Sequence, residues 1–437
     1  MRKKVYIFFV SFSLLTVIAG VGIKHRHKLL AFNQKRPYIT LTGPIEMADG
    51  IGKQVVELAE TLLDENFSIN ILAHHVNKVD VPSRILSLLR LKNKQLGKIV
   101  IAEESLWDHG TELAPRKLPT TTQPDQIRIA YSMLESTLIP PEWVMQLNLY
   151  YDAVAVPDSF LVETYIKSGV QIPIFEIPLG VDLQKFLKTP LKKERNPVMV
   201  FANFSSALDR KNQLLLVQAF AKALGNVEDA VLQINSRGGD EEIRDEIINE
   251  IIRSNCSNIR FTEFKLRKDA YIKLFQSVDC YVSLSKGEGF SIQPREAMAL
   301  GIPAIVTDNT GQTTICKSNL VKTVKSAILE PARYFGSPIP CGYRFNCDLD
   351  EAAAAIKDVY ENYGQYLQNA AQARTWAQAY DFSNENLRSL YKTLVKPKKL
   401  VLGTENKIHA DYLMTNSKIL YEKYQKIALN NLKSQPD

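Results

Sequence analysis

The apolar and polar positions after residue 36 form two series in which short apolar runs alternate with segments of helical period. The first series predicts a helix over 51–63 and strands at 38–42, 69–73, 99–102, 127–131, 153–157 and 174–178. The second predicts a helix over 212–224 and strands at 197–203, 230–234, 259–262, 280–284 and 304–307. Further helices are expected near 350–362, 366–379 and 384–394.

Two such series predict an α/β protein with two doubly wound, Rossmann-like domains. We place the N-terminal domain at 37–190 and the C-terminal domain at 191–395, because the polar, proline-flanked residues 179–197 suit a linker. Ligands of doubly wound sheets bind at the carboxyl ends of the strands. The cleft between the two facing domains is therefore the expected binding site.

An uncharged, mostly apolar segment of 19 residues, Val5–Ile23, precedes these domains. As a helix it would reach roughly 28 Å, close to the hydrocarbon thickness of a bilayer. A signal peptide has a shorter apolar stretch, about 7–15 residues, and then a small-residue cleavage site. Here Lys24, Arg26 and Lys28 follow instead. We therefore expect residues 1–36 to be an uncleaved membrane anchor with a basic flank; a cleaved signal peptide is the alternative.

Basic charge is concentrated at the two ends of the chain. Of the net charge of +7, residues 1–36 contribute eight Lys or Arg and no acid, and residues 396–437 contribute eight Lys and four acids. Residues 37–395 are mildly acidic, which argues against nucleic-acid binding by the body of the protein. The basic ends of the chain suit contact with anionic lipid. Five Lys or Arg follow the apolar segment and three precede it, which predicts a cytoplasmic body. Five cysteines without a CxxC pair fit a reducing compartment.

The most informative stretch is Ser285–Thr307, SKGEGFSIQPREAMALGIPAIVT. A predicted strand ends there in a glycine-bracketed loop, and glycine lets a ligand approach the backbone closely. Pro294 suits the first turn of a helix that Gly301 should end. Backbone N–H groups at the start of this helix would suit a diphosphate. Glu288 in the loop and Glu296 in the first helical turn could accept hydrogen bonds from hydroxyls of a sugar or a ribose.

This stretch resembles the signature of the retaining glycosyltransferases of the GT-B fold, family 4, written E-G-F-x5-E-A-M-A-x-G-x-P. The matching positions are Glu288, Gly289, Phe290, Glu296, Ala297, Met298, Ala299, Gly301 and Pro303. The resemblance extends over most of 38–395. It implies the GT-B fold, in which two Rossmann-like domains face a cleft.

The resemblance implies a role for each candidate residue. Glu288 would contact hydroxyls of the donor sugar, and Glu296 would take the ribose hydroxyls of the nucleotide. Lys211 matches the family's phosphate-binding lysine, with Arg210 beside it. The backbone that would hold the diphosphate or the sugar belongs to Gly289, Phe290 and Ser291.

The chain departs from the family pattern at two places. Many members carry an Arg five residues before the lysine, where this chain has Ser206. Arg210 or Arg237 could supply that charge. Some relatives use an acceptor-side catalytic His, whereas the equivalent region here offers Glu135 as a catalytic candidate. The histidines that are candidates only by location, and are expected to be structural or solvated, are His74, His75 and His109.

Two further segments are interpreted through the resemblance. Gly50 and Gly52 look like part of the family's first-strand glycine loop, which faces acceptor and phosphate; an ordinary strand-to-helix turn is the alternative. A final helix of GT-B enzymes crosses back onto the first domain, and 384–394 or the basic helical tail 396–437 could do so. The tail, with its amphipathic stretch at about 405–432, could instead rest on lipid or be a solvated helix face.

No metal and no cofactor are expected. Asp348-Leu349-Asp350 fits the metal-binding DxD pattern of sugar transferases of another fold, but it begins an Ala-rich helix, where acids cap the N-terminus. A P-loop and a complete dinucleotide fingerprint are absent from the sequence. Charge on a leaving diphosphate would be stabilised by Lys211, by Arg210 and by backbone amides.

We therefore predict a membrane-anchored retaining hexosyltransferase of glycan biosynthesis. It would move a hexosyl unit from a nucleoside-diphosphate sugar to a glycan or lipid-linked acceptor. Its partners would be donor, acceptor and membrane, and not nucleic acid. The alternatives are a non-catalytic GT-B sugar-binding protein, a nucleotide-sugar epimerase and an NAD-dependent oxidoreductase, of which the last is disfavoured by the missing fingerprint.

Overall fold

The computed structural model describes residues 38–395 except 48–49, 91–95, 104–125 and 335–338, with a few positions between 422 and 433. The expected anchor at 1–36, His109 and most of the tail therefore lie outside the described residues. No helix within the described part of the chain is long and apolar enough to cross a bilayer.

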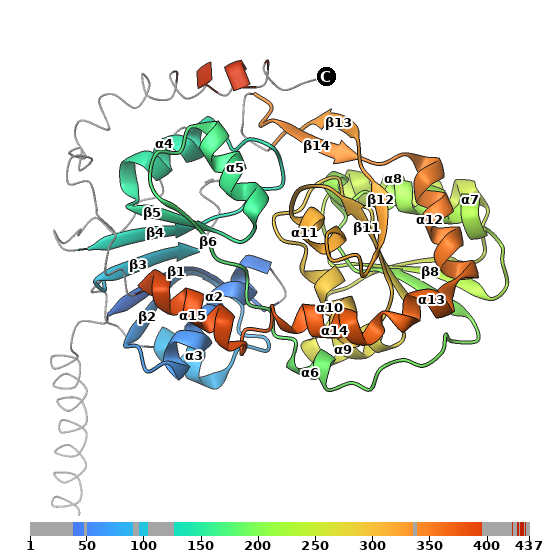
Figure 1. The fold of residues 1–437 in the computed structure, drawn as a ribbon, viewed down its shortest axis with the longest axis horizontal. Helices are drawn as coiled ribbons and strands as arrows, with labels where there is room; N and C mark the ends of the chain where they lie inside the picture. The colour runs from blue at the N-terminus through green and yellow to red at the C-terminus, as the bar shows by residue number, and fades with distance from the viewer. Residues whose placement is uncertain are drawn as a thin grey trace, which may run out of the picture.

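The first domain is built on a parallel six-stranded sheet in the order β2-β1-β3-β4-β5-β6 (Figure 1). Its strands are β1 (Ile39–Ile45), β2 (Ile69–Val76), β3 (Ile99–Glu103), β4 (Ile127–Tyr131), β5 (Ala153–Val156) and β6 (Ile174–Glu176). Its helices are α2 (Gly50–Asp64), α3 (Ser83–Leu89), α4 (Pro141–Tyr150) and α5 (Ser159–Ser168). The inner strands β3 and β5 are almost continuously Ile, Val and Ala, because a parallel sheet is covered on both faces. The strand order reverses between β1 and β3, and ligands bind at such switch points.

The second domain repeats the plan with a parallel sheet in the order β12-β11-β10-β7-β8-β9. Its strands are β7 (Met199–Asn203), β8 (Ala230–Ser236), β9 (Ile259–Glu263), β10 (Cys280–Ser283), β11 (Ala304–Asp308) and β12 (Lys322–Lys325). Its helices are η1 (Asp209–Lys211), α7 (Gln213–Leu224), α8 (Glu241–Ser254), α9 (Lys268–Gln276), α10 (Ile292–Leu300), η2 (Thr310–Gln312), α11 (Thr313–Cys316), α12 (Leu349–Glu361), α13 (Tyr363–Gln368) and α14 (Ala370–Gln378). Its switch point lies between β7 and β10. The expectation of an α/β protein with two doubly wound sheets is confirmed.

Strand β12, a following hairpin and helix α6 (Gln184–Leu187) were not expected from the sequence. Strand β12 has a single buried residue, Val324, so it presents no apolar run. An antiparallel hairpin of β13 (Ile328–Pro331) and β14 (Tyr343–Asn346) follows it and extends toward the first domain (Figure 1). The expected linker contains α6, whose buried Phe186 packs on Tyr271 and Phe275 of α9. In each case tertiary contacts override a weak local pattern.

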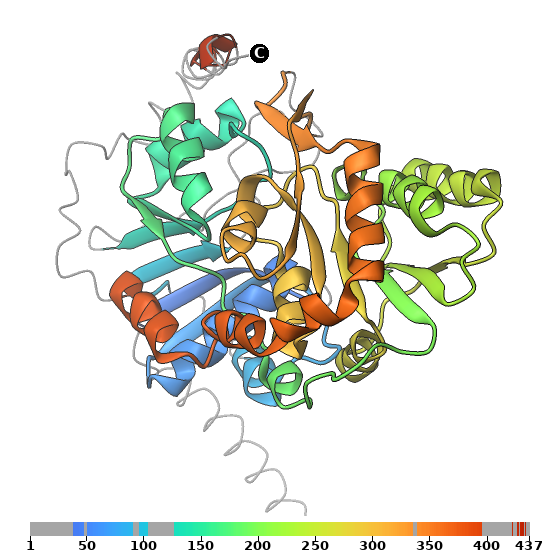
Figure 2. The same ribbon diagram turned by 45° about the vertical axis from the view of Figure 1, so that its right-hand side comes forward.

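The last helix of the body, α15 (Glu385–Val395), packs on the first domain although it follows the second in sequence (Figures 1 and 2). Lys392 lies 2.7 Å from Glu65 of the first domain. The Tyr391 hydroxyl donates to the Pro178 carbonyl at 3.0 Å and accepts from the Gly180 N–H at 2.8 Å. The 384–394 helix therefore crosses back onto the first domain, and Ile427 of the tail also packs on that domain, beside Gly169.

Asp348 caps α12: its side chain accepts hydrogen bonds from the N–H groups of Asp350 and Glu351. We expect Asp348→Ala to lower the free energy of unfolding by about 1 kcal/mol, the usual value of such a cap. Asp348→Asn should restore it, because asparagine caps as well. Urea unfolding of the three proteins provides the measurement. Loss of stability in both variants, or a dependence on added divalent metal, would contradict the capping role.

Candidate functional site

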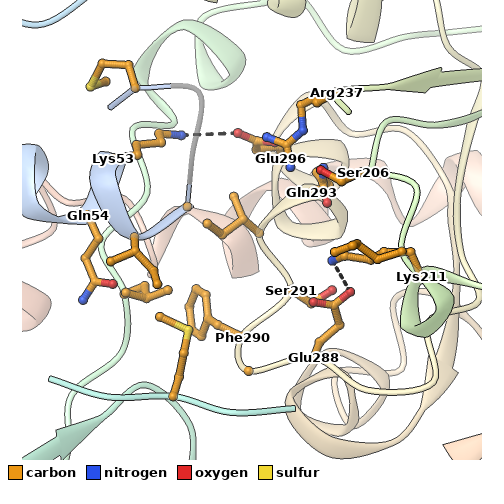
Figure 3. Close-up of a pocket in the computed structure, with 18 of the residues that line it drawn as sticks. Lys53, Gln54, Ser206, Lys211, Arg237, Glu288, Phe290, Ser291, Gln293 and Glu296 are labelled. Carbon is orange, nitrogen blue, oxygen red and sulfur yellow. Dashed lines mark hydrogen bonds and ion pairs between the residues drawn. The ribbon is translucent and has the colours of Figure 1, made fainter. Parts of the chain in front are cut away.

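A cavity of about 790 Å³ lies between the carboxyl ends of the two sheets and is lined by both domains (Figure 3). The first domain contributes α2 and the ends of β3 and β4, and the second contributes the loops that follow β7, β8, β9 and β10. Its size suits a drug-sized ligand or a nucleotide. The cleft expected between the domains is therefore present.

The loop between β10 and α10 takes its shape from unusual backbone conformations. Ser291 precedes α10 with a φ of 66°, and Gly301 ends the helix with a φ of 72°. Gly289 allows close packing, since a Cβ there would lie 3.0 Å from the sulfur of Met133. Gly289, Phe290 and Ser291 all line the cavity. Glu296 lies one turn further along α10 than the first turn in which we expected it.

An ion cluster joins the loop to η1 and to the first domain. Lys211 Nζ lies 2.5 Å from Glu288 Oε1, and Arg210 lies 3.1 Å from Glu288 Oε2. The other guanidinium nitrogen of Arg210 lies 3.0 Å from Glu135 Oε1. The two catalytic candidates, Glu288 and Glu135, are therefore bridged by one arginine. A Cβ at Gly287 would collide with the Glu135 carbonyl oxygen, so glycine is what allows this approach.

The charges in this cluster are strongly coupled. Burial opposes the ionisation of Glu288, but Lys211 and Arg210 outweigh it and lower the pKa of this carboxyl to about 2. Burial, reinforced by Arg210, lowers the pKa of Lys211 to about 8 in spite of its contact with Glu288. At neutral pH, Glu288 is ionised and Lys211 is mostly protonated. A carboxylate with so low a pKa accepts hydrogen bonds well but is a poor proton acceptor.

The lowered pKa of Lys211 predicts a pH-dependent affinity for diphosphate. The amine loses its proton as the pH rises through about 8, so its attraction for an anion is present below that pH and lost above it. We expect the affinity for inorganic pyrophosphate, measured calorimetrically, to fall about tenfold between pH 7 and pH 9.5. Lys211→Arg keeps its charge and should remove most of this dependence. An equal pH dependence in both proteins would contradict this assignment.

Glu296 is held by residues from both domains. The Tyr271 hydroxyl donates to Glu296 Oε2 at 2.7 Å, and Lys53 of α2 reaches Glu296 Oε1 at 3.5 Å across the cavity (Figure 3). Neither partner could be predicted from sequence spacing, because Lys53 is 243 positions away. A ribose diol at Glu296 would share this carboxylate with Tyr271 or displace Lys53.

Comparison with known proteins agrees with this geometry. Residues 184–327, which contain Arg210, Lys211 and Glu288, match the profile of the family Glycosyl transferases group 1. The chain carries a glycosyl transferases group 1 domain. Three members of the ion cluster (Arg210, Lys211 and Glu288) and Glu296 thus lie within this domain, whereas Glu135 lies outside it.

Two viral proteins are related in sequence. One, from Sulfolobus islandicus filamentous virus (isolate Iceland/Hveragerdi), bears a provisional glycosyltransferase name and is 28% identical over 179 residues, 40% of this chain and 45% of that protein. The other, Uncharacterized protein 356 of Sulfolobus islandicus rod-shaped virus 1, is 20% identical over 258 residues, 54% of this chain and 67% of that protein. The chain thus matches less than half the length of the first relative.

Solved structures share the fold of the whole two-domain body. Sucrose-phosphate synthase from Thermosynechococcus elongatus superposes with a TM-score of 0.58 at 14% identity, covering 82% of this chain and 99% of that one. Anabaena HepE, solved with UDP and glucose, has a TM-score of 0.55 at 15% identity, covering 83% and 100%. Trehalose-6-phosphate synthase OtsA has a TM-score of 0.55 at 12% identity, covering 83% and 99%. The glycosyl transferases group 1 domain is therefore the second half of a GT-B-like fold.

The other residues singled out from the sequence are placed as follows. Gly50 lines the cavity, but Gly52 does not: it packs on the first domain, where a Cβ would lie 2.6 Å from the Glu46 carbonyl oxygen. Ser206 and Arg237 both line the cavity near Gln293 (Figure 3). Ser206 thus lies beside the guanidinium that could replace the missing arginine.

His74 and His75 lie outside the site. His74 and His75 are exposed at the end of β2, where His75 lies 3.4 Å from Glu46. No group of three or more His, Cys, Asp or Glu in the described part of the chain could hold a metal ion. The five cysteines form no disulfide.

Sequence reasoning missed Arg295, which precedes Glu296 in the motif. Its side chain is fully buried, and its guanidinium lies 3.7 Å from the Phe290 ring centre and 4.5 Å from that of Tyr380. It donates hydrogen bonds to the carbonyls of Phe290 and, at 3.1 Å, Ser291. Arg295 therefore fixes the loop from below the cavity. In the sequence Arg295 stands between Pro294 and the charged Glu296, a context that does not mark it as buried.

Proposed function

We propose that the protein is a retaining glycosyltransferase that moves a hexosyl unit from a nucleoside-diphosphate sugar to a hydroxyl group of a glycan or lipid-linked acceptor. The proposal rests chiefly on one observation: Arg210, Lys211 and Glu288 form one ion cluster in a cleft between two doubly wound domains. UDP is the favoured nucleotide, because HepE was solved with UDP and glucose. Glycan biosynthesis is the role that this reaction implies.

In this reaction the bond between the anomeric carbon and the diphosphate oxygen breaks, and a bond to the acceptor oxygen forms. The acceptor's proton leaves with the diphosphate. Lys211 and Arg210 lie where they can stabilise the negative charge that grows on the diphosphate, which is usually the largest electrostatic contribution. They would then exchange part of their contact with Glu288 for contact with phosphate oxygens.

Glu288 suits the binding of donor hydroxyls rather than proton transfer, because its pKa lies near 2. Glu135 shares Arg210 with it and receives a hydrogen bond from the Tyr334 hydroxyl at 3.3 Å. We assign Glu135 to the acceptor side, where it would orient the attacking hydroxyl. The mechanism derived from these residues uses no metal ion.

The localisation is also a proposal. We propose that Val5–Ile23 anchors the protein in a membrane and that the body lies on the cytoplasmic side, where nucleotide-sugars are made. Fusions of a reporter to each terminus provide the test. An exported C-terminal reporter would contradict the cytoplasmic placement.

The test of the activity uses the full-length protein and a panel of nucleotide-sugars. We expect one donor to raise the melting temperature and to be slowly hydrolysed, and both effects to disappear in Glu288→Ala. Glu242→Ala, which changes an exposed glutamate on α8, is the matched control and should behave as the wild type. Binding without hydrolysis or transfer would support a non-catalytic sugar-binding protein. Binding of NAD alone would overturn the transferase proposal.

A further inference from the structure

Two buried polar side chains at the first-domain end of the cavity are left unpaired. Glu103 is 1% exposed, and neither of its carboxyl oxygens has a hydrogen-bond partner among the described residues. Gln54 is 4% exposed, and its side-chain nitrogen likewise has none among them. Both residues line the cavity. Buried polar groups are nearly always satisfied, so this pair requires an explanation.

The fold holds these two groups in fixed positions. Glu103 ends β3 at the switch point of the first sheet and is in register with Tyr131 of β4. On the other side, a Cβ at Gly43 of β1 would collide with the Glu103 carbonyl oxygen, so the two strands are in close contact. Gln54 lies on α2 beside Tyr131, whose hydroxyl donates to the Ile177 carbonyl. Figure 3 shows Gln54 pointing away from the Lys53–Glu296 pair.

Charge distinguishes this end of the cavity from the diphosphate end. Burial, together with the neighbouring Glu57, raises the pKa of Glu103 well above its usual range. Burial, with Asp182 nearby and opposed by Lys53 and Lys268, raises the pKa of Glu57 to about 7. Lys53 and Lys268 at this end pair with Glu57 and Asp182, whereas Lys211 and Arg210 supply positive charge at the other end. A neutral hydroxyl can both donate to and accept from groups such as Glu103 and Gln54.

The lining of the cavity also offers an apolar wall to a sugar ring. Trp143 lines the same cavity, is 4% exposed, and its indole N–H has no partner among the described residues. Met133, Leu179 and Phe290 add apolar surface to this wall. A hexose ring presents adjacent hydroxyls at its edge and C–H groups on its faces, which matches polar groups set in an apolar surface.

We propose that Glu103 and Gln54 form a subsite that binds adjacent hydroxyls of a neutral sugar ring in the acceptor. This rests on the proposed function, which it deepens by naming a carbohydrate as the part of the acceptor next to the reacting hydroxyl. A site built to hydrogen-bond hydroxyls rejects ligands that lack them, because its buried groups would stay unpaired. The subsite therefore selects the acceptor and leaves donor binding unchanged.

The test measures transfer by the full-length protein from its preferred donor to three kinds of acceptor. These are the methyl glycosides of glucose, galactose and mannose, the corresponding hexose 6-phosphates, and n-butanol. We expect at least one methyl glycoside to be at least tenfold better, in kcat/KM, than its phosphate and than butanol. A preference for the phosphate or for butanol would overturn the proposal.

Variants separate recognition from structure. Glu103→Met should raise the KM of the glycoside at least tenfold while the Kd for UDP stays within twofold, and the melting temperature should stay or rise, because an unpaired buried acid is replaced by an apolar side chain. Gln54→Met should have the same effect on KM. Gln126→Met, which changes another buried glutamine outside the cavity, is the matched control. An unchanged KM in Glu103→Met and Gln54→Met would overturn the proposal.

Failure of this proposal differs from failure of the proposed function. If the protein binds UDP and hydrolyses its donor but transfers to none of the glycosides, the carbohydrate subsite is wrong and the transferase stands. If it neither binds nor cleaves any nucleotide-sugar, the proposed function is wrong, and this subsite falls with it.

Discussion

Lys211→Ala is expected to lower kcat/KM with the preferred nucleotide-sugar by about 10²–10³-fold, the usual effect of removing one donor that stabilises charge in a transition state. Lys211 is half-buried and lies 2.5 Å from Glu288 at the cavity. The loss should fall mainly on kcat, because the charge on the diphosphate grows during bond breaking. Release of free nucleotide under steady-state conditions measures it.

Two variants make this result specific to the site. Lys211→Arg should retain part of the activity, since the charge remains although its geometry differs. Lys222→Ala removes an exposed lysine of α7 that pairs with Asp350 and should leave the rate unchanged. A decrease of less than threefold in Lys211→Ala would exclude Lys211 from the chemical step.

The second large effect is on stability. Arg295→Ala is expected to lower the free energy of unfolding by about 3–5 kcal/mol, because it removes hydrogen bonds to two loop carbonyls and leaves a cavity. Burying the Arg295 cation itself costs free energy, and the variant no longer bears this cost. The variant does, however, leave the carbonyls of Phe290 and Ser291 buried without their hydrogen-bond donor. Denaturant unfolding, followed by tryptophan fluorescence, gives the value.

Arg374→Ala is the matched control for Arg295. Arg374 also donates to two carbonyls of α10, those of Ala299 and Leu300, each at 2.9 Å, but its side chain is only partly buried. We expect a loss of about 1 kcal/mol there. If both variants lost the same free energy of unfolding, the stabilisation by Arg295 would not depend on its burial.

Much of the fold could be predicted from the sequence, because the signals are local. The strands of both sheets consist of apolar runs that a parallel sheet requires, and their predicted positions agree with β1 to β11 to within about three residues at each end. Strand β12 and the hairpin carry no such run, since their side chains are mostly exposed. Their positions depend on contacts with residues distant in sequence.

The same division applies to the site. The motif around Glu288 identified the loop and the helix, because glycine and helix-forming residues determine local backbone shape. The partners of these residues were not predictable: Lys53 and Tyr334 come from elements that only the tertiary fold brings close to Glu296 and Glu135. Sequence spacing gives no information on a contact across a domain boundary.

The packing of α15 on the first domain has a consequence for synthesis of the protein. Ribosomes deliver the chain from its N-terminus, and domains generally fold in that order. The first domain, however, receives its last helix only after residue 395 has been made, when the second domain is already complete. Until then, Tyr391 is missing from its contacts with Pro178 and Gly180. The N-terminal domain, although synthesised first, is therefore the last to be completed.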